Sequence, residues 1–148
     1  MLVTDERKVF FPSEEWLAAY VKKINENPKY AQAAAKWEGD FLYVIEPDGT
    51  EPEEFRSQAI ITYYDLWHGK CRNAFLVTPE TGTPDSEFVC SGSYSTWIKV
   101  LKGELDPIKA LMMRKFKLSG NMAKALRAGK AARELVRSAA MIENVEFL

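Results

Sequence analysis

The chain shows two periods of hydrophobic residues, and the period changes twice along its length. Before residue 37 the apolar positions follow helical spacing, at Trp16, Leu17, Tyr20, Val21 and Ile24. Ser13 is placed to cap a helix that runs to about Asn25. Asn27 and Pro28 begin a second, shorter helix that ends near Lys36. We therefore expect two helices to cover the N-terminal side of the core.

Residues typical of strands then take over. Aromatic and β-branched residues fill four runs, which predict strands over 41–45, 56–67, 71–78 and 87–91. His68 and Gly69 form a tight reversal between the second and third runs, so this pair reads as a hairpin. Four successive strands joined by short turns predict an antiparallel sheet.

The C-terminal part returns to helical spacing. We expect helices over 93–102 and 107–113, a short fifth strand over 115–118, and one long helix over 121–142. The long helix carries a continuous apolar face with several small residues. Helices on both sides of a run of strands predict a single α+β domain over residues 1–148. Its sheet of about five strands is mostly antiparallel, with the helices packed on one face.

The segment from Trp97 to Met122 combines two glycine stops with a helix start. Gly103 and Gly120 punctuate it, and Asp106 followed by Pro107 supplies a cap and a first helical residue. The signature positions are Trp97, Gly103, Glu104, Leu105, Asp106, Pro107, Leu111, Met112, Lys115, Lys117, Leu118, Gly120, Asn121 and Met122.

These positions resemble the C-terminal signature of the sterol carrier protein family, whose members are small lipid-binding domains of the SCP-2 type. The family usually has glycine just before the lysine that opens the short strand, and this chain has Arg114 there. The resemblance implies a hydrophobic tunnel between the sheet and the C-terminal helices. From the signature residues and from strand alternation we expect the tunnel to be lined by Ile61, Tyr63, Phe75, Trp97, Leu101, Leu105, Leu111, Met112, Phe116, Met122 and Leu126.

The composition of the chain excludes some classes of binding partner. The 148 residues are 47% hydrophobic and 28% charged, and 20 basic against 21 acidic residues give a net charge of −1. Such a balance provides no overall field for a polyanion, so we do not expect nucleic-acid binding. The N-terminal stretch lacks the apolar core of a secretory signal, and no run approaches the roughly 20 apolar residues of a membrane helix. We expect a cytoplasmic protein.

Groups for catalysis or cofactor binding are scarce. His68 is the single histidine, the two cysteines follow no metal or redox spacing, and no glycine-rich phosphate loop occurs. We therefore expect no metal, no cofactor and no enzymatic activity. Asp65 interrupts an apolar strand between Tyr63 and Trp67 and has two interpretations. It is either exposed or placed at a bulge, or it is a polar contact for the head group of a ligand.

The C-terminal half is rich in lysine and arginine, whereas acidic residues dominate the first hundred residues. These basic residues form either solvated helix faces or a weak patch for transient contact with an anionic membrane surface.

Three functions remain open from the sequence. The leading one is non-enzymatic binding and transfer of a fatty acid, an acyl chain or a sterol-like molecule. The second is an accessory module with a filled core, which serves as a dimerising partner of an enzyme encoded nearby; a homodimer of this chain is a separate prediction. The third is a small enzyme for a hydrophobic substrate, with Asp65 or a tyrosine as acid or base.

Overall fold

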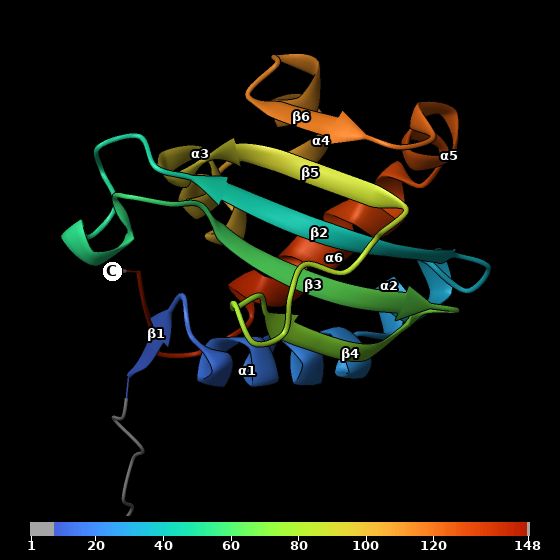
Figure 1. The fold of residues 1–148 in the computed structure, drawn as a ribbon. Helices are drawn as coiled ribbons and strands as arrows, with labels where there is room; N and C mark the ends of the chain where they lie inside the picture. Colours follow the sequence, from blue (N-terminus) through green and yellow to red (C-terminus); the bar gives the residue numbers. More distant parts are fainter. Residues whose placement is uncertain (1–7, 148) are drawn as a thin grey trace, which may run out of the picture.

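The computed structural model describes residues 8–147 and places a five-stranded sheet at the centre of the molecule. The first seven residues, which include much of the stretch argued not to be a secretory signal, lie outside this range. The sheet order is β4-β3-β2-β5-β6 (Figure 1). The strands are β2 (Glu38–Glu46), β3 (Ile60–Trp67), β4 (Lys70–Leu76), β5 (Phe88–Ser93) and β6 (Phe116–Ser119).

Most strand pairs are antiparallel, as the sequence predicts. Within the five-stranded sheet the exception is β2 with β5, which run parallel in a register that pairs Tyr43 with Cys90. β4 forms one edge of the sheet and β5 lies beyond β3 and β2, so the connection over 77–87 must cross the sheet instead of making a hairpin. Figure 1 shows this connection passing over the face that carries no helices.

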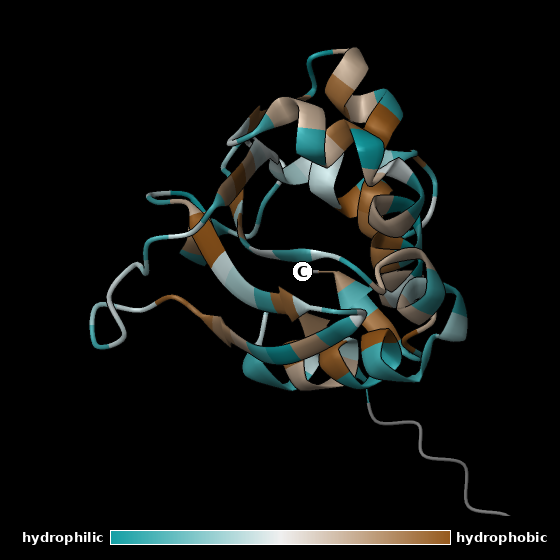
Figure 2. Cartoon of the chain, turned by 90° about the vertical axis from the view of Figure 1, so that its right-hand side faces the viewer, coloured by the Kyte–Doolittle hydropathy of each residue, from teal (hydrophilic) through white to brown (hydrophobic). Residues whose placement is uncertain are grey.

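The helices cover the other face of the sheet, which confirms the predicted α+β architecture (Figures 1 and 2). The helices are α1 (Glu14–Glu26), α2 (Pro28–Ala33), α3 (Tyr94–Leu101), α4 (Pro107–Met112), α5 (Met122–Arg127) and α6 (Gly129–Ala140), with a 3-10 turn η1 (Glu53–Phe55). α6 runs along the middle of the sheet and α1 beside β4. Among residues 8–147, none of the helices has the length and apolar character needed to cross a membrane.

The predicted helix starts are confirmed by their capping bonds. The Ser13 hydroxyl accepts a hydrogen bond from the Trp16 amide at 3.0 Å. Asn27 accepts from the amide of Lys29 at 3.0 Å, and Asp106 accepts from the amide of Ile108 at 2.7 Å. Each bond satisfies an amide that has no partner within its own helix, so each residue fixes where its helix begins.

The predicted long helix over 121–142 is wrong, because the chain breaks at Ala128 between α5 and α6. Ala128 has φ −96° and ψ 22°, outside the helical range, and Gly129 starts α6. A further pair of strands has no counterpart in the prediction. β1 (Val9–Phe11) and β7 (Val145–Phe147) pair in parallel and bring the two ends of the described chain together. Strands of three residues are too short to show a period in the sequence.

α4 ends in a tight turn at Arg114. The Arg114 amide donates to the Leu111 carbonyl at 3.1 Å, and the Lys115 amide donates to the Ala110 carbonyl at 2.9 Å. These two bonds define a Schellman motif, in which the residue after the cap adopts the left-handed conformation. Arg114 does so with φ 60°. The position therefore has the geometry that favours glycine, although the side chain here is arginine.

Candidate functional site

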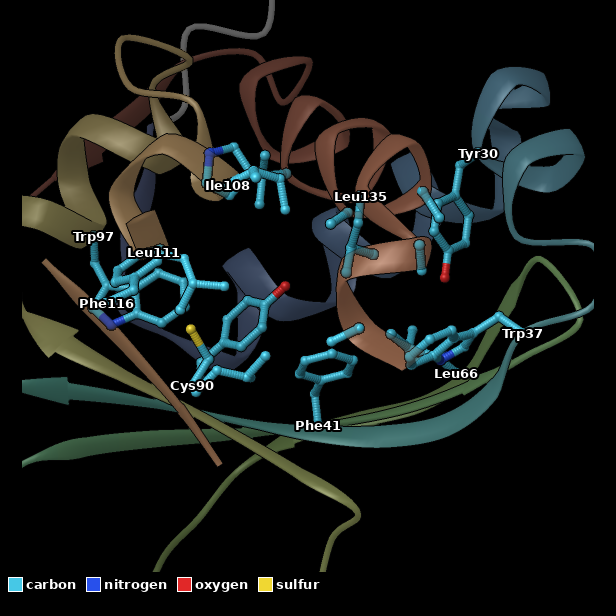
Figure 3. Close-up of a pocket in the computed structure, with 18 residues that line it drawn as sticks. Tyr30, Trp37, Phe41, Leu66, Cys90, Trp97, Ile108, Leu111, Phe116 and Leu135 are labelled. Atoms are coloured by element: carbon cyan, nitrogen blue, oxygen red, sulfur yellow. The ribbon is translucent and has the colours of Figure 1, made fainter. Parts of the chain in front are cut away.

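An internal cavity lies between the inner face of the sheet and the C-terminal helices (Figure 3). Its volume is about 90 Å³, less than the roughly 150 Å³ of an apolar cavity that admits benzene. The lining is almost entirely apolar. It consists of Tyr30, Trp37, Phe41, Tyr43, Leu66, Cys90, Trp97, Pro107, Ile108, Leu111, Phe116, Leu118, Ala125, Ala128, Ala131, Ala132, Leu135 and Val136.

The sheet forms the floor of this cavity. Phe41 and Tyr43 are two residues apart on β2, so their side chains project from the same face. Cys90 on β5 joins them because it pairs with Tyr43 in a parallel register. In Figure 3, Phe41 and Cys90 rise from the sheet toward Leu135 of α6, which lies above them.

An aromatic cluster closes one end of the cavity. The Trp97 ring lies 4.5 Å from the Tyr43 ring and 4.4 Å from the Phe116 ring, measured between centroids. The Trp97 indole N–H donates to the Val44 carbonyl at 3.0 Å, which anchors α3 to β2. Gly92 gives Phe116 its space, since a Cβ there would lie 2.5 Å from the phenyl ring.

α4, α5 and α6 form the remaining walls. Ile108 and Leu111 project inward from α4, and Ala125 projects inward from α5. α5 buries none of its side chains and contributes only this short methyl group to the lining. Small residues thus leave the space that larger ones would fill.

Polar groups in the lining are few and uncharged. The Tyr43 hydroxyl lies 3.4 Å from the Tyr20 hydroxyl, which donates to the Leu135 carbonyl at 3.0 Å. Burial raises the pKa of Tyr43, and it raises the pKa of the Cys90 thiol to about 12. Both groups are therefore neutral at physiological pH. The Tyr30 hydroxyl points into the cavity and has no hydrogen-bond partner among residues 8–147 (Figure 3).

Three of the predicted lining residues line this cavity: Trp97, Leu111 and Phe116. Leu101 is buried in the core instead, and Leu105 packs at the edge of the core. Neither of these two leucines reaches the cavity.

The predicted residues of the hairpin lie on the opposite face of the sheet. The buried positions of β3 are the even-numbered ones, from Ile60 to Leu66, so Ile61 and Tyr63 face outward. Phe75 is also outside, where its ring packs against that of Tyr63 at 5.0 Å. The assumed inward face of this hairpin is therefore wrong by one residue.

Met112, Met122 and Leu126 lie on the predicted helices but face solvent. Their exposed fractions are 78%, 41% and 49%. On α4 the inward positions are taken by Ile108 and Leu111, whereas Met112, the last residue of the helix, is exposed. We therefore exclude these three from the cavity lining.

Most of the residues that line the cavity are not predicted from the sequence. Phe41 and Tyr43 alternate on a predicted strand, and that spacing is a usable signal. The alanines at 125, 128, 131 and 132 lie in the segment whose small residues suggest close packing. In the structure they border an open space instead. Tyr30 and Trp37 come from the N-terminal part, where no signal points to the cavity.

Asp65 has a structural role on the outer face. Its carboxylate accepts two hydrogen bonds from the Arg72 guanidinium, at 3.1 and 3.0 Å. The β3–β4 register shifts between Asp65 and Leu66 because Arg72 is an extra residue on β4. Asp65 therefore lies opposite a bulge of the partner strand and is not itself the bulged residue. Because Asp65 faces away from the cavity, it contacts no molecule bound there.

Comparison with known proteins agrees with this fold. A profile of the SCP-2 sterol transfer family matches residues 17–133. A crystal structure of sterol carrier protein 2 is 36% identical, with 88% of this chain and 97% of that chain covered and a TM-score of 0.76. A solution structure from Thermus thermophilus, described as possibly sterol carrier protein, is also 36% identical, covering 88% and 87% with a TM-score of 0.76.

A more distant structure, sterol carrier protein 2 from Yarrowia lipolytica in its apo form, is 14% identical over 93% of this chain and 99% of that chain. Its TM-score of 0.56 reflects the shared fold. No match was found among curated proteins. The family profile, the identity to two solved structures and the arrangement of sheet and helices agree, so this chain belongs to the SCP-2 sterol transfer family.

Proposed function

We propose that this protein binds a lipid by its apolar chain in the cavity between the sheet and the C-terminal helices, and carries it without chemical change. The observation that supports this most is the lining: its 18 residues include no charged side chain. Such a surface favours an apolar chain, since each buried methylene contributes about 0.8 kcal/mol. A filled core, which the accessory-module hypothesis requires, does not fit the presence of this cavity.

Binding a complete acyl chain requires a larger cavity than the one in this structure. A volume of about 90 Å³ is small for an acyl chain. α5 is the wall best able to move, because it buries no side chain. In this proposal α5 swings outward as the lipid enters, and the alanines of α6 form the fixed side of the widened cavity.

The Tyr30 hydroxyl supports a ligand with one polar end. It points into the cavity and lacks a hydrogen-bond partner among the described residues. This hydroxyl can form a hydrogen bond with a carboxyl or hydroxyl group of the ligand, and such a bond contributes about 0.5–1.5 kcal/mol. This feature suits a fatty acid or a sterol-like alcohol better than a plain hydrocarbon.

The names of the two structures at 36% identity support a sterol or another lipid as the cargo. Nothing in the lining selects a ring system over a flexible chain. We do not propose enzymatic activity, because the neutral hydroxyls and the thiol of the cavity lining provide no catalytic base. The free thiols of Cys71 and Cys90 suit a reducing compartment, which supports the cytoplasmic location. A homodimer remains a prediction from the sequence.

Native mass spectrometry, combined with displacement of a fluorescent fatty acid, tests the proposal. Ala132→Phe puts a ring into the cavity from α6, and Ala123→Phe adds the same ring to the exposed side of α5. We expect the first variant to lose at least 10-fold in affinity and the second to bind like the wild type. Equal binding by both variants, or no acyl binding by the wild type, would contradict the cavity as the lipid site.

A further inference from the structure

We propose that the cap formed by α4, β6 and α5, residues 107–127, is a docking surface for a bilayer that contains anionic phospholipids. This inference rests on the proposed lipid-carrying function and names the surface from which the cargo is exchanged. The cap lies at one edge of the sheet, where β6 is the last strand (Figure 1). It combines basic residues, exposed methionines and a wall of the cavity.

All charged residues of the cap are basic. Residues 107–127 contain six lysines and arginines and no aspartate or glutamate. One of the six is paired with a carboxylate of another segment, Lys124 with Glu87 at 2.8 Å. The other five form no ion pair within residues 8–147 and are exposed: Lys109, Arg114, Lys115, Lys117 and Arg127. A local excess of this size, in a chain of net charge −1, favours an anionic surface.

Large apolar side chains are exposed among these charges. Met112 and Met113 at the end of α4 are 78% and 50% exposed, and Met122 and Leu126 on α5 are 41% and 49% exposed. Exposed apolar residues next to lysines and arginines are typical of elements that lie at a membrane interface. Unbranched methionines can enter the acyl region while the long basic side chains reach the phosphates.

The same elements form the inner wall of the cavity. Ile108 and Leu111 of α4 face inward, whereas Met112 next to them faces outward. On α5, Ala125 faces inward and Leu126 outward. One layer of backbone therefore separates the proposed contact with the bilayer from the proposed lipid site. A lipid that leaves the membrane through the cap would not have to cross the solvent.

A bilayer fits this surface better than a nucleic acid or an acidic protein. A nucleic acid would use the charges but leave the methionines in water. An acidic protein partner would need a shaped apolar counterpart, and the two short helices present single side chains instead of a groove. A bilayer requires only charge and insertable apolar side chains, and the cap has both.

Flotation with vesicles of phosphatidylcholine alone, and of phosphatidylcholine mixed with phosphatidylglycerol, tests the proposal. Lys115→Ser with Lys117→Ser removes two charges from the cap, and Lys22→Ser with Lys70→Ser removes two exposed charges elsewhere. We expect the wild type to bind only the mixed vesicles. The cap pair should weaken that binding by about 5-fold for each lysine, and the control pair should not.

The contribution of the exposed methionines to vesicle binding is tested separately. Met112→Ser with Met122→Ser should weaken vesicle binding about 10-fold. Met141→Ser is the matched control, because Met141 is as exposed as Met122, at 41%, but lies outside the cap. Thermal unfolding of each variant shows whether it is folded, and all these positions are exposed.

Loading of a fluorescent fatty acid in solution, without vesicles, distinguishes this inference from the proposed function. Cap variants that load normally but no longer bind vesicles support the docking surface. Vesicle binding that is absent in the wild type, or unchanged in both cap variants, overturns it even if loading is normal. Absent loading with intact, cap-dependent vesicle binding overturns the lipid site and leaves the docking surface standing.

Discussion

Arg114 stands at a backbone position that suits glycine. Its φ of 60° lies in the left-handed region, where a side chain costs about 1–2 kcal/mol relative to the right-handed one. The Schellman bonds of α4 hold this geometry in place. The family resemblance points to this residue because glycine usually occupies it, and the structure gives the physical reason: the turn requires a left-handed residue here, so the arginine is strained.

We expect Arg114→Gly to stabilise the protein by about 0.5–1 kcal/mol, because relief of the strained φ exceeds the extra entropy of glycine in the unfolded chain. Urea unfolding measures the change. Arg127→Gly is the control, since Arg127 is also exposed but closes the right-handed helix α5. That control should destabilise by up to about 1 kcal/mol. A loss of stability in Arg114→Gly would show that the arginine makes a stabilising contact that outweighs its strain.

The faces of β3 show why single residues are hard to assign from sequence. One face carries Ile60, Thr62, Tyr64 and Leu66, and the other carries Ile61, Tyr63, Asp65 and Trp67. Both faces contain aliphatic and aromatic residues, so alternation separates them without showing which is buried. Which face is buried depends on the side of the sheet against which the helices pack, and this is determined by the whole chain.

α5 is held over the cavity mainly by one side chain. The Lys124 ammonium donates to the Glu38 carbonyl at 2.6 Å and to the Glu87 carboxylate at 2.8 Å. It also lies 5.0 Å from the centre of the Trp37 ring, a distance suited to cation–π attraction. Since no side chain of α5 is buried, these contacts connect the helix to β2 and to the start of β5.

We expect Lys124→Met to loosen α5 without unfolding the rest of the protein. The lost ion pair and cation–π contact contribute about 1 kcal/mol together, because both are partly exposed to solvent. Hydrogen exchange of the α5 amides should become about 5-fold faster, and exchange in α6 should not change. Release of bound fatty acid should accelerate by a similar factor.

Arg127→Met on the same helix provides the comparison, since Arg127 has no carboxylate partner among residues 8–147. If the two variants exchange at the same rate, Lys124 does not hold α5 closed.

At the level of elements the sequence predicts more than at the level of residues. Helix starts with a cap and proline, such as Asp106 with Pro107, are located correctly because the signal is local. The break at Ala128 is missed because the apolar face continues across it, although Gly129 marks the place. The parallel pairing of β2 with β5 depends on how a loop crosses the sheet, which no local pattern encodes.

Buried neutral groups should make the stability of the whole molecule sensitive to alkali. Burial raises the pKa of both Cys71 and Cys90 to about 12, well above the roughly 8.5 of an unfolded chain. The unfolded state therefore loses these protons first as the pH rises. The contribution of the two thiols to the free energy of unfolding should be constant below about pH 8.5 and should fall above it, by up to about 1.4 kcal/mol per pH unit for each thiol.

Urea unfolding between about pH 7 and about pH 10.5 measures this slope, and Cys90→Ala should reduce it. Buried Tyr43, whose pKa is also raised, adds to the loss only above about pH 10. A slope that is equal in the variant and the wild type would show that Cys90 is accessible to hydroxide in the folded protein.

The overall architecture is predictable because it follows from the order of elements: helices, then strands, then helices again. The cavity lies in the general place that the sequence predicts, between sheet and C-terminal helices, but only Trp97, Leu111 and Phe116 of its expected lining line it. A hollow core and a filled one use the same residue types. What distinguishes them is the space beside small side chains such as Ala132, and that depends on packing.

The pairing of β1 with β7 affects how the protein would respond to a mechanical load. The two strands run in the same direction, with Val9 beside Val145 and Phe11 beside Phe147. A force that pulls the ends of the chain apart would act at the start of β1 and at the end of β7, along the strands and in opposite directions. It would slide one strand past the other and load their hydrogen bonds together, instead of opening them one after another as in a zipper. Tension applied at the two termini would therefore meet this short ladder before it reached the sheet.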